Sequence, residues 1–489
     1  YFIVRSAALP IGDFGNYYYA SKFLLHGRWG TWIYDPASFN LAIYSEGQRN
    51  FFLNYTPVPP LSALLYLPFA AFDAAVSKIL SNSVNAVLLL FSLHRLQAYF
   101  KVNLWLMLLV PVLFFTPIRN IVYEGQSYFL LLFLLSEGLI RYLEQEKWVA
   151  MLLWALSIHL KVSPAFVVLF LLFEKDWKAL LKLATVTVLC LLASLPFLGT
   201  STWTNYSINI LPRLFNGEIN NTYSVNYQSM QVLLKTLFVP DLMHNPAAWF
   251  NNPVTYHRLS GAFNILIYGI AALCAFTKVK PEIKYCTWLM CAMLVSGYGN
   301  SFGLLLLVIP LFCLHTYFTA SKGLFITIAV ALFLIANLPL SWSASLPVPL
   351  QFPRLYLLIA LFFTCVFFIK PVLKPYYFLT LFFAFIIPAD LKKYTQNYFL
   401  PREENILTYN FNLQDDSLAI LYFDDLGPQQ KKMALPFHTK KVTDLKPAGK
   451  VFPHEYIPVS KLVNDSIIIY LSDRNRGIGF YTLRYELLK

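Results

Sequence analysis

The chain has 489 residues, of which 57% are hydrophobic and 13% are charged. Soluble globular proteins carry about 25% charged residues, so the composition excludes that class and predicts an integral, polytopic membrane protein. The net charge of +13 does not indicate nucleic-acid binding, because the basic residues are dispersed between apolar segments instead of lining a groove with aromatic residues. We interpret them as determinants of membrane topology.

At the beginning of the chain, Tyr1-Phe2-Ile3-Val4 looks like the stub of a truncated apolar helix, and we expect one further helix upstream. The six cysteines fall within or beside apolar segments and include no CxxC pair. Neither a disulfide framework nor a zinc site is therefore expected, and no cofactor is predicted.

The first polar feature is the stretch 12–20, in which Asp13 is followed by Tyr17 and Tyr18. A carboxylate in a polar, aromatic loop ahead of many hydrophobic helices indicates chemistry at the membrane surface. The alternatives are a solvated loop acid and an N-cap for a helix over 16–25.

The same outer loop, 8–82, contains Tyr55 and a proline-rich turn at 57–60, followed by an apolar run. Because three prolines resist a straight helix continuing from upstream, we expect 59–75 to form a juxtamembrane helix in the interface and not a span. The aromatic residues of this loop suit that depth.

Apolar windows continue along the chain as candidate helices. They fall at 84–99, 103–118, 127–142, 147–160, 162–174, 180–198, 258–277, 284–299, 302–318, 323–340, 354–370 and 374–390. The pair 147–160 and 162–174 is shorter than the ~20 residues of a spanning helix. It predicts a helical hairpin with Lys161 near its apex, close to the outer leaflet.

Every second turn between these segments is basic, for example at Arg95, Arg141 and Lys280. Basic turns lie in the cytoplasm, which places the loops 8–82 and 199–257 and the tail 391–489 outside. We expect residues 1–390 to form the transmembrane core. In the tail, short alternating runs bounded by turn residues predict a small β-rich domain.

An ordered set of motifs resembles glycosyltransferase family 87, a family of C-type membrane glycosyltransferases. The set comprises Asp13-Phe14 with Tyr17-Tyr18, Tyr55-x-Pro57-x-Pro59-Pro60, Glu124-Gly125-Gln126-Ser127, Lys161-x2-Pro164, and Lys175-Asp176-Trp177-Lys178. The resemblance spans about residues 10–310 and implies an all-α core of about thirteen spans, the first of them truncated.

The resemblance also implies roles. Asp13 matches the family's proposed catalytic base, Gly125-Gln126 its Gly-Gln turn and Lys161 its Lys before Pro, while Asn226-Tyr227-Gln228-Ser229 loosely matches an Asn-x-Ser element. The family's Trp and His before the tenth span are replaced here by the turn 297–302. The implied function is transfer of a sugar, with mannose as first candidate, from a polyprenyl-phosphate donor to a glycan, lipid or protein acceptor on the extracytoplasmic face of a bacterial inner membrane.

Such a reaction needs a base for the acceptor hydroxyl and cations for the departing phosphate. The candidate substrate-binding residues are Tyr17, Tyr18, Tyr55, Arg119, Glu124, Gln126, Lys161, His257 and Arg258. Several have structural alternatives: Lys161 pairs with Glu124 or snorkels, Arg119 caps the third span, and His257-Arg258 is an interfacial flank. His159 is better explained as a satisfied buried histidine. No metal is predicted at Asp13 and Glu124, because neither acid belongs to an Asp-x-Asp or Glu-x-Asp pair.

The alternative function is a membrane transporter or lipid flippase. Transporter folds usually contain paired halves with interrupted helices, and the Asp13 and Lys161 elements have no second copy in the sequence.

Overall fold

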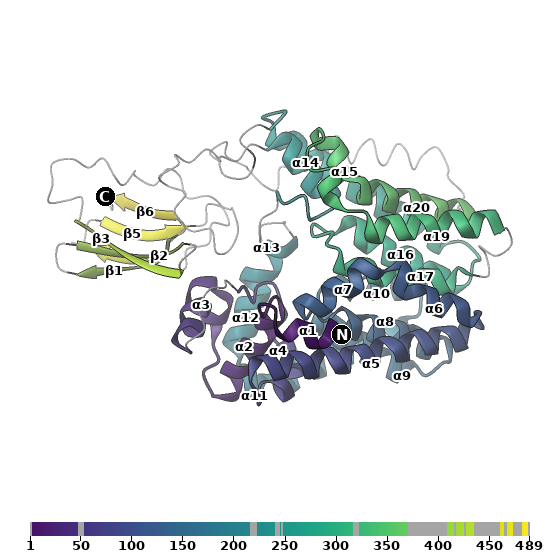
Figure 1. The fold of residues 1–489 in the computed structure, drawn as a ribbon, viewed down its shortest axis with the longest axis horizontal. Coiled ribbons are helices and arrows are strands. Elements are labelled where there is room, and N and C mark those ends of the chain that lie inside the picture. Colours follow the sequence, from purple (N-terminus) through teal and green to yellow (C-terminus); the bar gives the residue numbers. More distant parts are fainter. Residues whose placement is uncertain are drawn as a thin grey trace.

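The structure is a computed structural model that describes residues 2–46, 53–215, 223–239, 245, 248–315 and 322–369, together with six strands between 408 and 487. Helices dominate residues 2–369 and pack around one extensive apolar core. Figure 1 shows α5, α8 and α9 on one side of this helical body and α15, α19 and α20 on the other. The predicted segment 374–390 lies outside the described residues.

The first half of the chain contributes a mixture of long and short helices. They are α1 (Phe2–Ala7), α2 (Phe14–Leu25), α3 (Pro36–Ser45), α4 (Ser62–Leu65), α5 (Ala74–Phe100), α6 (Leu104–Leu113), α7 (Phe115–Glu124), α8 (Tyr128–Leu143), α9 (Lys147–Leu160), α10 (Phe166–Phe173) and α11 (Trp177–Leu198). Short 3₁₀ turns η1 (Thr31–Tyr34), η2 (Leu67–Phe69) and η3 (Ser163–Ala165) lie between them.

The second half continues the helical body. Its helices are α12 (Thr200–Asn205), α13 (Leu211–Phe215), α14 (Met230–Phe238), α15 (Pro253–Ala275), α16 (Pro281–Val295), α17 (Val308–Cys313), α19 (Lys322–Asn337) and α20 (Pro353–Ile369). A π-helical turn, η4 (Tyr206–Ile210), and the 3₁₀ turns η5 (Phe302–Leu307), η6 (Leu340–Trp342) and η7 (Val348–Gln351) connect them.

Six strands follow near the end of the chain. Strands β1 (Thr408–Gln414), β2 (Ser417–Asp424) and β3 (Gly427–Ala434) form one antiparallel sheet, and β4 (Ser460–Val463), β5 (Ile467–Ser472) and β6 (Thr482–Leu487) form another, both in sequence order (Figure 1). That these strands make up an independent domain outside the membrane stays a prediction.

In the part of the chain that the structure describes, three helices are long and apolar enough to cross a membrane: α5, α11 and residues 254–275 of α15. A fourth span results if α6 and α7, which bend by 64° at their junction, are counted together. The other described apolar helices are shorter. The long apolar helices indicate an integral membrane protein, whereas the number of thirteen spans stays a prediction.

The bend between α6 and α7 interrupts the single segment expected over 103–118. Pro117 has no N–H with which to continue the helical hydrogen bonds. The side chain of Asn337, at the end of α19, replaces them: its Nδ2 donates to the Leu113 carbonyl at 2.7 Å and its Oδ1 accepts from the Thr116 N–H at 2.8 Å. Two distant segments are thereby joined at the break.

The single juxtamembrane helix expected over 59–75 is not formed. Residues 62–69 make only the short turns α4 and η2, and α5 already begins at Ala74. Pro68 has no N–H to donate to the Leu64 carbonyl, which explains why α4 ends after one turn.

The hairpin predicted around Lys161 is present. Helix α9 ends at Leu160, Lys161 is extended (φ −148°, ψ 147°), and η3 and α10 run back. At the open end, Lys147 Nζ lies 3.2 Å from Asp176 Oδ2. Because this ion pair joins the start of α9 to the end of α10, Lys161 lies at the opposite end, ~20 Å away at 1.5 Å per residue.

Ion pairs join the basic turns at this open end of the helices. Glu137 is paired with Arg95 at 2.9 Å and with Arg141 at 2.7 Å, and Lys284 is paired with Glu174 at 2.8 Å. The turns that the sequence assigns to the cytoplasm therefore lie at a common end of the helical body, away from Lys161.

Candidate active site

Asp13 immediately precedes α2, which begins two residues earlier than the helix expected from the sequence. Its backbone is helical (φ −62°, ψ −19°), and its carboxylate makes no capping hydrogen bond to the described part of α2. Instead, Asp13 Oδ2 accepts a hydrogen bond of 2.6 Å from Gln126 Nε2. The N-cap alternative is therefore wrong, and the carboxylate is directed toward the turn after α7.

Two glycines allow the Asp13 loop to approach that turn. Gly125 ends α7 in the left-handed region (φ +66°), and a Cβ atom on it would lie 2.5 Å from Phe14 Cβ. Gly12 (φ +61°) has the same restriction, since its Cβ would lie 2.4 Å from a carboxylate oxygen of Glu124. Side chains at these positions would separate the two segments.

Gln126 connects Asp13 to Lys161. The Lys161 Nζ lies 3.4 Å from Gln126 Oε1 and 4.6 Å from the ring centre of Tyr128. It also interacts electrostatically with Tyr17 and with Asp13. Segments that are far apart in sequence thus bring a carboxylate to the nitrogen and an ammonium to the oxygen of one buried amide group.

Glu124 lies beside Asp13, but its nearby cation is Lys78 and not Lys161. Lys78, on α5, is 1% exposed and interacts with both Glu124 and Asp13. Its Nζ donates to the Pro10 carbonyl at 2.9 Å. The pairing of Lys161 with Glu124, considered as a structural alternative, is therefore not formed.

The three predicted tyrosines have different surroundings. Tyr17 stacks on Tyr66 with ring centres 4.6 Å apart, and its hydroxyl lies 3.2 Å from Ser127 Oγ, next to Gln126. Tyr18 donates to the Phe72 carbonyl at 2.9 Å, and the buried Tyr55 hydroxyl lies 2.8 Å from Ser62 Oγ. Tyr17 thus borders the Asp13 cluster, whereas Tyr18 and Tyr55 hold the first outer loop together.

The remaining predicted cations are spread more widely. Arg119 contacts Asn120 Oδ1 at 3.2 Å, and Asn120 in turn donates to Ser301 Oγ at 3.3 Å. His257 and Arg258 lie in the first turns of α15, and Figure 1 shows α15 and α2 at opposite ends of the helical body. The structure does not bring His257 or Arg258 to Asp13.

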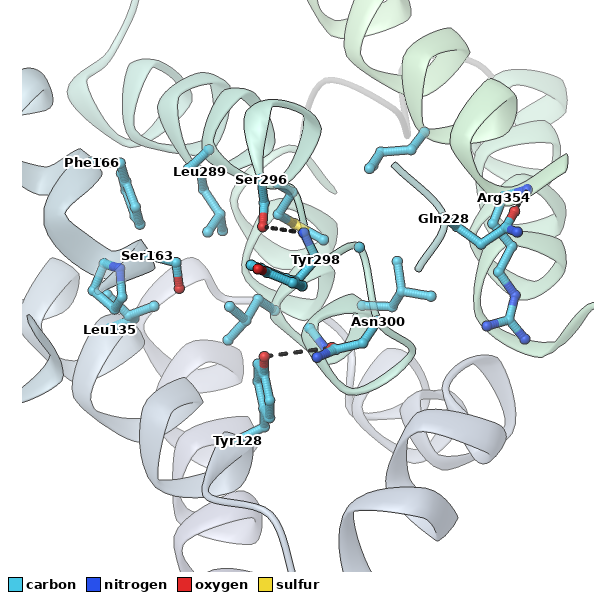
Figure 2. A pocket seen from close by; sticks show the side chains of 18 residues that line it. Tyr128, Leu135, Ser163, Phe166, Gln228, Leu289, Ser296, Tyr298, Asn300 and Arg354 are labelled. Atoms are coloured by element: carbon cyan, nitrogen blue, oxygen red, sulfur yellow. Dashed lines mark hydrogen bonds between the residues drawn. The ribbon is translucent and has the colours of Figure 1, made fainter. Parts of the chain in front are cut away.

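A pocket with about 690 Å³ of empty space, open solvent included, adjoins the Lys161 side of this cluster. Tyr128 belongs to both, because its ring faces Lys161 while its hydroxyl lies 3.5 Å from Asn300 Oδ1. Figure 2 shows Leu135, Phe166 and Leu289 on one side of the pocket and Gln228 and Arg354 on the other. The pocket therefore has an apolar and a polar side.

The polar side is built from three separate segments. The backbone N–H of Gln228 donates to the Gly299 carbonyl at 2.9 Å, and its side-chain Oε1 accepts from the Arg354 N–H at 3.2 Å. Ser229 donates to the Gly297 carbonyl at 3.1 Å and caps α14. The loosely matched element 226–229 thus packs on the turn 297–302.

Comparison with known proteins identifies the family. The family model of glycosyltransferase family 87 matches residues 55–297. The chain carries a glycosyltransferase family 87 domain. It is a membrane glycosyltransferase, as the motif resemblance predicted. Searches of curated proteins and of solved structures found no match.

The matched residues of this glycosyltransferase include Glu124, Gln126 and Lys161 but not Asp13. Asp13 is connected to the matched region through its hydrogen bond with Gln126. Asn300 and Arg354 also lie beyond the matched residues, although both line the pocket.

Sequence reasoning missed several residues that the structure places at the candidate site. Lys78 and Arg354 were not selected because each is a cation near the start of an apolar helix, where membrane topology explains its presence. Tyr227 was named only as part of a motif. In the structure, burial and then the nearby Asp13 charge raise the pKa of its hydroxyl. For Lys78, the signal was its distance from other charges: it stands four residues into α5, and the other charged residue of that helix, Arg95, lies near its far end.

Proposed function

We propose that this glycosyltransferase transfers a sugar, with mannose as the first candidate, from a polyprenyl-phosphate donor to a glycan, lipid or protein acceptor. Asp13 acts as the general base, and Lys161 binds the phosphate of the donor. The observation that carries this proposal is the Asp13–Gln126–Lys161 chain, because it places a base and a cation on either side of one polar side chain.

The chemistry follows from this arrangement. An oxygen of Asp13 removes the proton from the acceptor hydroxyl while that hydroxyl attacks the anomeric carbon. The bond from this carbon to the phosphate oxygen breaks, and the leaving polyprenyl phosphate carries the negative charge toward Lys161. The configuration at the anomeric carbon inverts, since one displacement occurs and no covalent intermediate forms.

Gln126 has a positioning role in this scheme. Its Nε2 donates to one carboxylate oxygen of Asp13, so the other oxygen can accept the acceptor proton. Its Oε1 holds the Lys161 ammonium. Tyr17 and Tyr128 border Lys161, and Glu124 with Lys78 fixes the Asp13 loop from the other side.

The other candidate substrate-binding residues have separate places in the proposal. Arg119 lies near the turn 297–302 through Asn120 and is assigned to the donor phosphate together with Lys161. Tyr18 and Tyr55 support the loop that carries Asp13. No role in the Asp13 cluster is proposed for His257 and Arg258.

The reaction is proposed to occur on the extracytoplasmic face of a bacterial inner membrane. Its support is the separation of Lys161 from the ion-paired basic turns, which are expected in the cytoplasm. We also infer that residues 391–489 form an outer domain that shapes access of the acceptor, with 1–390 as the catalytic core.

A panel of radiolabelled polyprenyl-phosphate sugars, incubated with the purified protein and an acceptor mixture, tests the donor class. We expect release of polyprenyl phosphate and label in the acceptor with one sugar. Transfer from a nucleotide sugar but from none of the polyprenyl donors would overturn the proposal.

A further inference from the structure

The only cation among the described residues that line the pocket is Arg354, in the first turn of α20. Its side chain is 6% exposed. One guanidinium nitrogen donates to the Leu338 carbonyl at 2.8 Å, whereas Nε is buried without a hydrogen-bond partner among the described residues. No described carboxylate forms an ion pair with it.

A buried guanidinium without an anionic partner is costly, because its charge and its N–H groups have lost water. Arg95 and Arg141 illustrate the usual solution, since both bind Glu137. Arg354 differs from them in lining a pocket. An anion that enters this pocket would provide the missing charge and accept from the guanidinium.

The rest of the pocket defines the kind of anion. Phe166, Leu135 and Leu289 cover the side away from Arg354 (Figure 2), and leucines of η5 extend the apolar lining. A small inorganic anion would not use this apolar surface. The pocket therefore suits an anionic group attached to a long hydrocarbon.

Hydrogen bonds also hold the backbone at Arg354 beside the pocket. Its backbone N–H donates to Gln228 Oε1, and Gln228 Nε2 donates to the Gln351 carbonyl at 3.0 Å. Gln228 thus ties the start of α20 to the turn at Gly299, where Asn300 contacts Tyr128. The Tyr128 ring also contacts the Lys161 ammonium, so the pocket lies beside the proposed reaction centre.

We propose that Arg354 is a further phosphate-binding residue, contributed by this pocket, and that the phosphate belongs to a polyprenyl lipid whose chain lies along the apolar side. The assignment to the donor rests on the proposed function, whereas the phosphate site itself does not. Arg354 would bind the phosphate, and Lys161 would lie on its side nearest to Asp13.

Binding of undecaprenyl phosphate and of neutral undecaprenol in detergent micelles tests the site without catalysis. We expect wild-type protein to prefer the phosphate form, and Arg354→Gln to reduce that preference by about tenfold or more, since hydrogen bonds to charged groups are lost. Arg354→Lys should restore part of it. Arg28→Gln, which removes an exposed arginine paired with Glu46, is the matched control and should bind like wild type.

Two outcomes would contradict the inference. Equal binding of undecaprenyl phosphate and undecaprenol by wild-type protein excludes a phosphate site, and an unchanged preference in a folded Arg354→Gln variant excludes Arg354. Competition by phosphatidylglycerol as strong as that by undecaprenyl phosphate would support the phosphate site but overturn its assignment to the donor. Failure of sugar transfer alone would contradict the proposed function and leave the binding result valid.

Discussion

The carboxylate of Asp13 is held in one orientation by its neighbours. The residue is half-buried, stands before α2, and directs its carboxylate to Gln126 instead of to the helix N-terminus. Glycine at positions 12 and 125 permits this contact, because any larger residue would collide with Glu124 or Phe14. The carboxylate is thereby oriented before any substrate binds.

Replacing Asp13 by Asn keeps the side-chain shape and removes the base. We expect a folded Asp13→Asn enzyme whose turnover is lower by about 10²–10⁴-fold, the usual contribution of general base catalysis. Asp73→Asn, at an exposed acid before α5 in the same outer loop, is the control and should remain active. Wild-type turnover in Asp13→Asn would remove Asp13 from the mechanism.

Lys161 is the second residue whose removal discriminates between roles. Lys161→Met preserves chain length and removes the charge, so donor binding should weaken about tenfold to 100-fold if the ammonium contacts phosphate. Titration of donor affinity measures this. Lys182→Met is the control, because Lys182 lies over Trp148 at the open end of the hairpin, away from Lys161. A more stable variant with unchanged donor affinity would assign Lys161 a purely structural position.

At the scale of elements, the broken helix α6–α7 is the clearest case of local sequence combined with a distant partner. Pro117 favours a break, because it has no N–H to donate. The backbone groups left open at the break, however, bond to Asn337, more than two hundred residues later. The break directs α7 so that Glu124, Gly125 and Gln126 reach the Asp13 loop.

Asn337→Ala should therefore destabilise the protein. It leaves the Leu113 carbonyl and the Thr116 N–H without their partner, at a cost of about 1–3 kcal/mol. Thermal unfolding in detergent measures the change. Asn209→Ala removes an exposed asparagine bonded to Asn205 within its own turn and should have little effect; an equal loss in both variants would contradict the special role of Asn337.

At the scale of the whole molecule, charge is distributed between two ends of the helical body. One end carries Glu137, Arg141, Lys147 and Asp176 in ion pairs, and the other carries Lys161 with the Asp13 cluster. This asymmetry supports the predicted orientation, in which the ion-paired end faces the cytoplasm.

Cysteine labelling in intact cells tests that orientation. In a background without native cysteines, a cysteine at position 417 should react with an impermeant thiol reagent, because the tail is predicted to lie outside. A cysteine at position 280, in a basic turn, should react only after the membrane is opened. The reverse pattern would place Asp13 in the cytoplasm and favour a nucleotide-sugar donor.

The sequence by itself determined the membrane class, the positions of most apolar helices, the hairpin with Lys161 at its apex and the resemblance to family 87. These depend on composition, local periodicity and short motifs, all of which are readable along the chain. Three expectations were corrected: the helix over 59–75, the straight segment 103–118 and a Lys161–Glu124 pair. Each depended on which backbone and charged groups bond to one another in the folded chain.

Only the tertiary structure decided the neighbours of Asp13. Gln126, Lys78 and Lys161 come from three different helices or turns, and Arg354 reaches the adjoining pocket from a fourth. A single cation at the start of an apolar helix has the same appearance whether it marks topology or faces a ligand. Its burial and the absence of a described carboxylate beside it, as at Arg354, are properties of packing and not of the local sequence.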